Sequence, residues 1–318
     1  MAFPLKYIFF KTPSFHNRFC IFRLIFNSTI SLVCSVTKNI MTKYIQLFIA
    51  IIFSTSNLHA QSIIALGQTD QIYSTILKEN RTINIYFPED YNSTDTIKYP
   101  IIYILDGGIK EDFIHLVGIV RYYTQPWIAQ FPKSIVVGIE NTNRKRDFTF
   151  AVSNLDFLEK EGFKKENFPQ YGKSGAYISF LQKELQPYME NKYNANKDRT
   201  VIGESLAGLL ASEILLKQPD LFTKYIIIAP SLWWGEQKLL FETANLLNTN
   251  IKKSLSVYLG VPNKDEDIKM YNESIKFSQS LKQNNNINLS FDYLPTELHA
   301  TIVHQAVYNA FKKLYPKN

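Results

Sequence analysis

One short segment constrains the fold of this chain more than any other. An apolar, strand-like run leads directly into the sequence GESLA (203–207), and a helix-like run leaves it. A serine at the tip of such a turn is exposed above the sheet in a strained backbone conformation. The residues two before and two after it crowd each other, so both must be small, as Gly203 and Ala207 are. The segment predicts a strand-turn-helix with Ser205 as nucleophile; the alternative is that Ser205 is an ordinary helix N-cap.

Apolar runs of strand length alternate with helix-length segments along the rest of the chain. We predict strands at 82–87, 99–105, 134–139, 200–202, 224–229, 254–259 and 287–294, and helices at 175–189, 206–217, 236–248, 266–283 and 300–314. The run YPIIYIL (99–105) is apolar on both faces, as a strand covered by helices on both sides requires. This alternation predicts an α/β fold with a mostly parallel central sheet flanked by helices, and antiparallel strands at its first edge. An α+β fold is the alternative.

The net charge of +7 does not indicate nucleic-acid binding. Residues 1–60 contain six basic and no acidic residues, so residues 61–318 are nearly neutral. A folded body of this kind has no reason to bind polyanions.

Residues 41–60 have the three parts of a secretory signal peptide. Lys43 supplies the positive charge, 45–53 form the apolar run, and Ala60 offers a small residue for cleavage. That run has about nine residues, whereas a membrane-spanning helix needs about 20; an anchor or a buried helix is the alternative. We interpret 1–40 as an upstream over-call of the reading frame. The mature chain is then a single domain, 61–318, without a membrane span, periplasmic or secreted.

A serine nucleophile needs a base, and residues 61–318 contain three histidines, His115, His299 and His304. His299 follows the last predicted strand, in the loop from which an imidazole can reach the carboxyl end of the sheet. His304 falls within the final helix and His115 in a helix-like stretch before the serine. We therefore predict His299 as the base, with a surface or capping histidine as the alternative.

The acid that orients the histidine is expected in the loop after the strand at 254–259. That loop offers three adjacent carboxylates, Asp265, Glu266 and Asp267, of which we prefer Glu266. Acidic residues are also favoured at a helix N-terminus, so at least two of them have that simpler explanation. Glu297 is a further candidate for a local hydrogen bond to His299, and a Ser-His pair without an acid stays open.

An oxyanion hole needs two N–H donors. One is expected from Leu206, at the start of the helix after the serine. The second is expected from Gly107 or Gly108, where glycine lets the backbone approach a substrate closely. A simple turn is the alternative reading of the two glycines.

Several stretches together resemble a known family. They are 99–107, 136–149, 174–177, 202–208, 231–234 and 297–300. From about 72 to 312 the chain resembles the putative-esterase branch of the α/β-hydrolases, which includes ferric-siderophore esterases, S-formylglutathione hydrolases and feruloyl esterases. The resemblance implies the α/β-hydrolase fold, Ser205 as nucleophile and His299 as base. It leaves the acid open, and it is greatest for the siderophore-esterase-like members.

Four further residues bear on the substrate. Trp233 and Trp234 follow the strand at 224–229, at the edge where such sheets bind ligands, and suit an aromatic or sugar-bearing ester. Core packing is the alternative for one of them. Arg144 and Arg146, which form a basic cluster with Lys145 between them, could meet an anionic substrate such as a catecholate; a structural pair of arginine with Asp147 is the alternative.

These features predict an exported serine hydrolase that cleaves a small-molecule carboxylic ester through an acyl-enzyme. The alternatives are a non-catalytic ligand-binding protein on the same scaffold and an acyltransferase. No phosphate loop, zinc-ligand spacing or HExxH motif is present in the sequence, so we expect no metal and no cofactor.

Overall fold

The computed structural model describes residues 29–30, 32–49, 64–94 and 96–315. The chain divides into two units, Met1–Ile64 and Ala65–Asn318. In the first unit, residues 29–30 and 32–49 are helical with exposed side chains, and this helix includes 41–49 of the predicted signal peptide. The expected cleavage point after Ala60 lies outside the described residues. Within the described parts of the chain, no helix has both the length and the apolar character needed to cross a membrane.

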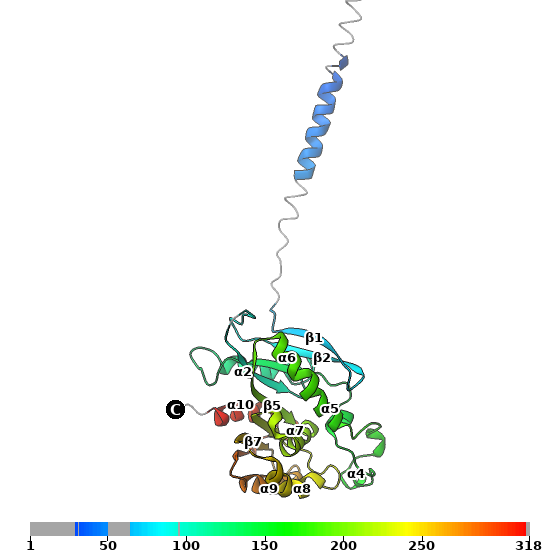
Figure 1. The fold of residues 1–318 in the computed structure, drawn as a ribbon. Helices are drawn as coiled ribbons and strands as arrows, with labels where there is room; N and C mark the ends of the chain where they lie inside the picture. Colours follow the sequence, from blue (N-terminus) through cyan, green and yellow to red (C-terminus); the bar gives the residue numbers. More distant parts are fainter. Residues whose placement is uncertain (1–28, 31, 50–63, 95, 316–318) are drawn as a thin grey trace, which may run out of the picture. The chain divides into compact units, whose positions relative to one another are not determined.

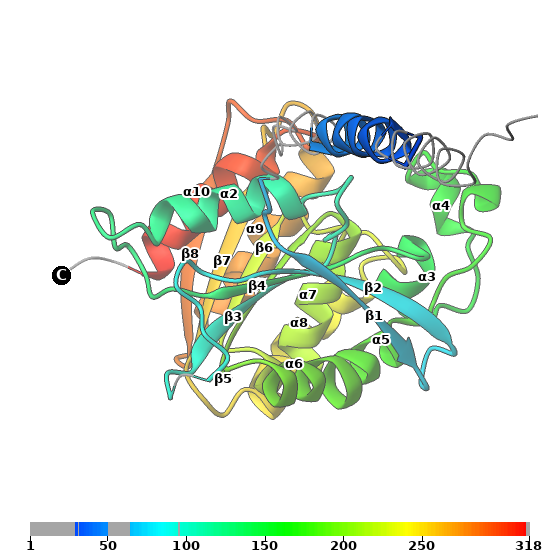
Figure 2. The ribbon, with the colours of Figure 1, turned by 90° about the horizontal axis from the view of Figure 1, so that it is seen from above.

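The second unit, whose ribbon is drawn in Figure 1, is built on one eight-stranded sheet with the order β1-β2-β4-β3-β5-β6-β7-β8, whose strands are labelled in Figure 2. The strands are β1 (Gln68–Ser74), β2 (Glu79–Tyr86), β3 (Tyr99–Ile104), β4 (Ile135–Ile139), β5 (Ala195–Glu204), β6 (Lys224–Ile228), β7 (Leu255–Val261) and β8 (Ile287–Tyr293). β2 runs antiparallel to both β1 and β4, and all other neighbours are parallel. The predicted mostly parallel sheet with an antiparallel first edge is confirmed.

Helices cover both faces of this sheet (Figure 2). One face carries α2 (Phe113–Tyr123) and α10 (Ile302–Leu314). The other carries α5 (Ser174–Phe180), α6 (Gln186–Lys192), α7 (Leu206–Lys217), α8 (Lys238–Asn250) and α9 (Ile268–Lys282). Alternate residues of β3 enter the two cores. Ile101 and Tyr103 pack in the core on the α7 side of the sheet, and Ile102 and Ile104 pack in the core on the α2 and α10 side. This division is the reason that the strand is apolar on both faces.

Three parts of the chain depart from the predicted elements. The sequence pattern does not predict β1, because most of its side chains are polar and only Ser74 is buried. β5 begins at Ala195, several residues before its apolar end. The expected helix at 175–189 is divided into α5, a π-helical segment (Leu181–Leu185) and α6. The connection from β4 to α5 is a long excursion, defined here as residues 140–173, that carries α3 (Arg144–Phe148), α4 (Phe157–Lys160) and a 3-10 turn (Lys165–Asn167).

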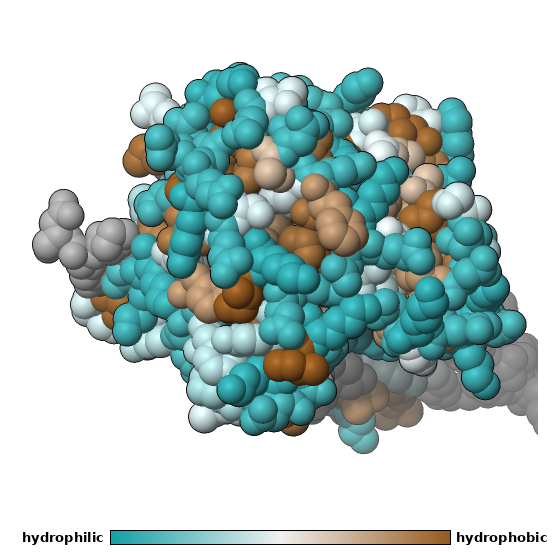
Figure 3. All heavy atoms as spheres, turned by 90° about the horizontal axis from the view of Figure 1, so that it is seen from below, coloured by the Kyte–Doolittle hydropathy of each residue, from teal (hydrophilic) through white to brown (hydrophobic). Residues whose placement is uncertain are grey.

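The surface on the side of α4, α8 and α9 is mainly hydrophilic (Figure 3). Hydrophobic side chains appear there in small separate groups. Phe241 of α8 is one of the exposed apolar residues, at 76% exposure. Single exposed apolar residues are ordinary on soluble proteins and do not mark an interface.

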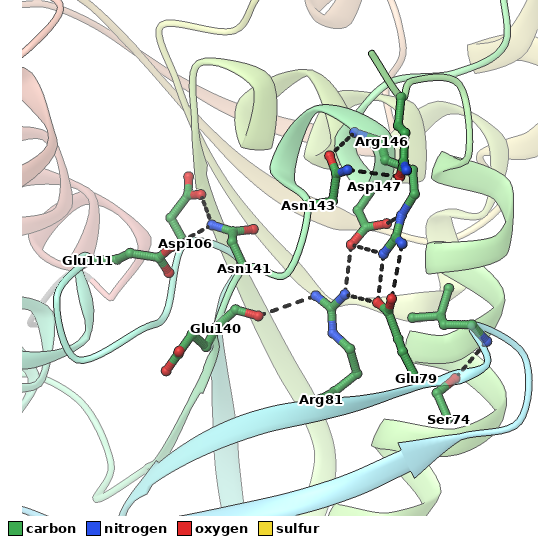
Figure 4. Close-up of polar contacts among 12 residues, drawn as sticks. Ser74, Glu79, Arg81, Asp106, Glu111, Glu140, Asn141, Asn143, Arg146 and Asp147 are labelled. Carbon is green, nitrogen blue, oxygen red and sulfur yellow. Dashed lines mark hydrogen bonds and ion pairs between the residues drawn. The ribbon is translucent and has the colours of Figure 1, made fainter. Parts of the chain in front are cut away.

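A buried ion-pair cluster fastens the excursion to β2 (Figure 4). Arg81 of β2 is fully buried, and its Nη1 lies 2.7 Å from Asp147 Oδ2 and 2.8 Å from Glu79 Oε1. Arg146 joins the cluster, with its Nε 2.7 Å from Asp147 Oδ1 and its Nη2 2.6 Å from Glu79 Oε1. Two guanidinium groups and two carboxylates thus balance one another. Removing one partner would leave a buried charge uncompensated.

We predict that Asp147→Asn lowers the free energy of unfolding by about 3 kcal/mol, the lower end for a broken buried pair, because Glu79 still contacts Arg81. Asp220→Asn is the matched control, since Asp220 and Lys253 pair with side chains 75% and 73% exposed. It should change stability by less than about 1 kcal/mol. Urea unfolding of both variants measures the difference. Equal losses of unfolding free energy in the two variants would show that the cluster does not stabilise the fold.

Candidate active site

The segment around Ser205 forms the sharp turn that the sequence predicts. β5 ends at Glu204 and α7 begins at Leu206, and Ser205 between them has φ 58° and ψ −117°. A Cβ on Gly203 would lie 2.4 Å from the Ala207 carbonyl oxygen, so only glycine fits there. The Ser205 side chain makes no capping hydrogen bond to α7, which removes the reading of Ser205 as an ordinary N-cap. Its Oγ lies 3.3 Å from Ser231 Oγ instead.

Ser205 and His299 line the same cavity, which has a volume of about 480 Å³. His299 lies in the loop between β8 and α10, as predicted. Its Nε2 lies 3.1 Å from Glu204 Oε1, and its buried Nδ1 has no hydrogen-bond partner within the described structure. Burial lowers the pKa of the His299 imidazole, so the ring is neutral at neutral pH. His304 is in α10, where it faces the His115 ring at 5.8 Å between centroids.

The three candidate carboxylates of the β7–α9 loop have different partners. Glu266 Oε2 accepts a hydrogen bond of 2.6 Å from the backbone N–H of His299, so it holds the loop and not the ring. Asp267 is the N-cap of α9 and accepts from Met270 N–H. Asp265 is exposed. Glu297 accepts from the Thr301 hydroxyl at 2.7 Å. The predicted role of Glu266 as the acid that orients the imidazole is therefore corrected, because its carboxylate contacts the His299 backbone.

The two glycines after β3 do not supply the second oxyanion donor. Gly107 N–H donates to the Ile139 carbonyl at 3.0 Å, and Gly108 N–H donates to Glu111 Oε2 at 2.7 Å. Neither glycine lines the cavity, whereas Leu206 does. A Cβ on Gly107 would lie 2.2 Å from Gly138 Cα, so the need for glycine comes from strand packing. The expectation for Gly107 and Gly108 is therefore corrected, and Leu206 remains the candidate donor.

Arg144 and Arg146 lie in different parts of the structure, the first at the cavity and the second in the buried ion-pair cluster. Arg144 lines the cavity, makes a two-point contact with Asp106 at 2.7 and 2.9 Å, and donates to the Glu204 carbonyl at 2.9 Å. Asp106 is also bonded to Asn141 (Figure 4). Arg146 does not line the cavity and belongs to the buried cluster with Asp147. Its expected substrate role is wrong because both sides of its guanidinium already face carboxylates.

The two tryptophans also separate. Trp233 lines the cavity and stacks on Phe163 with 5.0 Å between ring centroids. Trp234 is fully buried, and its Nε1 donates to the Phe150 carbonyl at 2.9 Å. Trp234 therefore packs in the core and is not a substrate contact.

Sequence reasoning missed several residues of the cavity. They come from the excursion and from α9, which are far apart in the sequence: Glu161, Phe163, Phe168 and Lys269. Lys145, from the basic cluster considered for an anionic substrate, also lines the cavity. Lys269 forms an ion pair with Glu161 and so joins α9 to the end of α4. Lys145 Nζ lies 4.8 Å from the centre of the Phe168 ring. The only sequence signal was the unusual length of the connection between β4 and α5, which carries these aromatic residues.

The described residues contain no cluster of three or more histidine, cysteine or acidic side chains that could hold a metal ion. The lining of the cavity offers a serine hydroxyl, an imidazole and carboxyl groups, together with three cationic side chains, Arg144, Lys145 and Lys269.

Comparisons with known proteins agree with this geometry. The family model described as putative esterase matches residues 74–313. The chain belongs to the putative esterase family. Over 188 residues it is 27% identical to the ferri-bacillibactin esterase BesA of Bacillus subtilis, a match that covers 55% of this chain and 63% of that protein.

Two solved structures show the same fold. An IroE-like serine hydrolase from Shewanella oneidensis superimposes with a TM-score of 0.72 and 26% identity, covering 78% of this chain and 80% of that one. The BES protein from Bacillus cereus gives 0.70 and 26%, covering 81% and 98%. With the strand order, these matches identify the predicted α/β-hydrolase fold. Family and relatives together support a carboxylic ester hydrolase.

We predict that Trp233→Phe and Trp234→Phe affect different properties, the first KM and the second stability. Trp234→Phe leaves the buried Phe150 carbonyl without its donor, which should cost about 1–3 kcal/mol of stability and leave KM unchanged. Trp233→Phe should change KM for an aromatic ester at least about threefold, with nearly unchanged stability. Urea unfolding and steady-state kinetics measure both. A KM effect confined to Trp234→Phe would contradict the assignment.

Proposed function

We propose that this protein is an exported serine esterase in which Ser205 is the nucleophile and His299 the general base. The observation that carries the proposal is the strained Ser205, placed in one cavity with the His299 imidazole and the first N–H groups of α7. A non-glycine residue at positive φ costs about 1–3 kcal/mol and persists where the surrounding structure enforces it. Such strain is typical of a nucleophile that must be exposed above the sheet.

The proposed reaction follows from these positions. Ser205 Oγ attacks the carbonyl carbon of the ester while its proton passes to the His299 imidazole. The negative charge that develops on the carbonyl oxygen is stabilised at the N-terminus of α7, where Leu206 is the first residue and its N–H has no acceptor within the helix. The imidazolium then gives its proton to the departing alcohol. Water repeats the steps in reverse order and releases the acid.

The lining of the cavity favours an aromatic, anionic ester. Trp233, Phe163 and Phe168 offer aromatic surfaces, and Lys145 brings to the same cavity a positive charge that no carboxylate pairs with in the described structure. A catecholate siderophore ester has both properties, and the resemblance to siderophore esterases agrees with it.

Export is proposed from the sequence of residues 41–60, with Lys43, the apolar run and Ala60 as the signal peptide. A periplasmic or secreted esterase would meet its ester outside the cytoplasm. Residues 1–40 would then precede the natural start at Met41.

We predict that Ser205→Ala reduces hydrolysis of p-nitrophenyl acetate by at least about 10³-fold, with unchanged circular dichroism, because the nucleophile alone is removed. Labelling by a fluorophosphonate probe should be lost together with activity. Ser212→Ala is the matched control, since Ser212 is buried in α7 and bonds only the Gly208 carbonyl within the described structure. Ser212→Ala should keep both the hydrolysis and the labelling. Full activity in Ser205→Ala would refute the serine mechanism, and an inactive but ligand-binding natural protein would favour a binding function.

We predict that the mature protein isolated from its natural source begins at Gln61. Cleavage after Ala60 places this residue first, because signal peptidase acts after a small residue that follows the apolar run. N-terminal sequencing of the secreted or periplasmic protein measures it. A first residue before position 41 would contradict both the signal peptide and the proposed start.

A further inference from the structure

The residue before the nucleophile contacts the proposed base. Glu204 is the last residue of β5, and its Oε1 lies 3.1 Å from His299 Nε2. The Glu204 side chain is only 15% exposed, and Oε1 is buried without completing an aligned hydrogen bond in the described structure. Glu266, the expected orienting acid, is bonded to the His299 backbone instead. A carboxyl group in contact with the ring thus comes from the nucleophile's own turn.

The charges around Glu204 disfavour its ionised form. Burial, with Asp106 and Asp112 from the loop before α2, raises the pKa of Glu204 to about 8, and Arg144 from α3 opposes the shift. The Arg144 guanidinium is already engaged by Asp106, and its Nη2 lies 3.8 Å from Glu204 Oε2. Among the described residues, the cation beside Glu204 is therefore Arg144, which is shared with Asp106.

Some groups around His299 raise the pKa of its imidazole and others lower it. Burial lowers the pKa of the His299 imidazole, Arg144 lowers it further, and Glu266 and Asp267 from the β7–α9 loop raise it. The net result is a lowered pKa, so near pH 7 a neutral imidazole faces a neutral carboxyl group. Such a pair titrates as a unit, and the observed pKa values belong to both groups together.

We propose that Glu204 is a positioning residue that shares a proton with the His299 imidazole, so that the base becomes free only when the pair releases this proton. The inference rests on the proposed serine mechanism. It adds Glu204, a residue of the Ser205 turn whose protonation depends on pH, to the proposed nucleophile and base.

The proton count explains the effect. When the pair holds two protons, either Glu204 donates O–H to Nε2 while Nδ1 carries the second proton, or an imidazolium faces a carboxylate. In both arrangements no imidazole nitrogen is free to accept the Ser205 proton. Loss of one proton to solvent leaves a Glu204 carboxylate beside Nε2–H of a neutral imidazole. The other ring nitrogen, Nδ1, is then free to accept a proton. The imidazolium that forms during attack then lies beside a carboxylate, which stabilises it.

The test is the pH dependence of kcat/KM for p-nitrophenyl acetate between pH 5 and 10. In the natural protein we expect the rate to rise with a midpoint near 8, well above the 6.5 of an ordinary imidazole. In Glu204→Gln the pair loses its titrating carboxyl group, and the midpoint should fall below 6.5. At pH 6 the fraction of maximal activity should then be at least about tenfold higher in the variant. Its maximal kcat should be lower, because no carboxylate stabilises the imidazolium.

Two further variants separate this role from a general effect of removing a carboxyl group. Glu213→Gln is the matched control, because Glu213 is a buried glutamate of α7 that pairs with Lys217 and does not line the cavity. Its midpoint should equal that of the natural protein. Glu266→Gln should lower kcat/KM without moving the midpoint to the acid side. An acid shift in Glu266→Gln with none in Glu204→Gln would overturn the proposal.

A measurement on the natural sequence covers the case in which Glu204→Gln fails to fold. The imidazole C2–H resonance of His299 should shift in two steps by NMR, one below pH 6.5 and one near 8. A single step near 6.5 would refute the shared proton. Absent hydrolysis and absent fluorophosphonate labelling of the natural protein would refute the serine mechanism instead, so the two failures are distinguishable.

Discussion

The crowded turn between β5 and α7 is the constraint on which the rest of the site depends. Gly203 approaches Ala207 so closely that no side chain fits, and Ser205 takes a strained conformation between them. The turn is also fixed from outside. Ser205 N–H donates to the Ile228 carbonyl at 3.0 Å, and Arg144 donates to the Glu204 carbonyl at 2.9 Å. The neighbouring strand and the excursion therefore hold the strain that exposes the serine.

The sheet and the turn were predictable from sequence because their signals are local. β3 must be apolar on both faces, and the turn must have small residues on both sides of Ser205; both are visible in a short window. His299 was predictable because the parallel strands bring their carboxyl ends to one edge. β1 gave no such signal, since an edge strand with most of its side chains exposed or half-buried has little apolar pattern.

The errors concern residues whose partners lie far away in the sequence. Nothing local distinguishes Arg144 from Arg146; one meets Asp106 and the other Glu79, 67 positions earlier. Trp233 and Trp234 are adjacent, and only the packing of the excursion decides which of them faces the cavity. The oxyanion role of Gly107 failed for the same reason, because its N–H is used by β4. Adjacent residues of one type on an irregular segment cannot be divided by periodicity.

The charge balance of the site separates structural cations from those available to a substrate. Arg144 is bound at two points to Asp106 and also to the turn, so a substrate anion would have to displace a carboxylate to reach it. Lys145 lies at the cavity without a carboxylate partner in the described structure, and its Nζ donates to the Asn167 carbonyl at 2.6 Å. Since an anion gains most from a cation that no other anion neutralises, the proposed anionic group of the substrate belongs at Lys145, beside the aromatic face of Phe168. The excursion thus sets the substrate preference, while the strands set the chemistry.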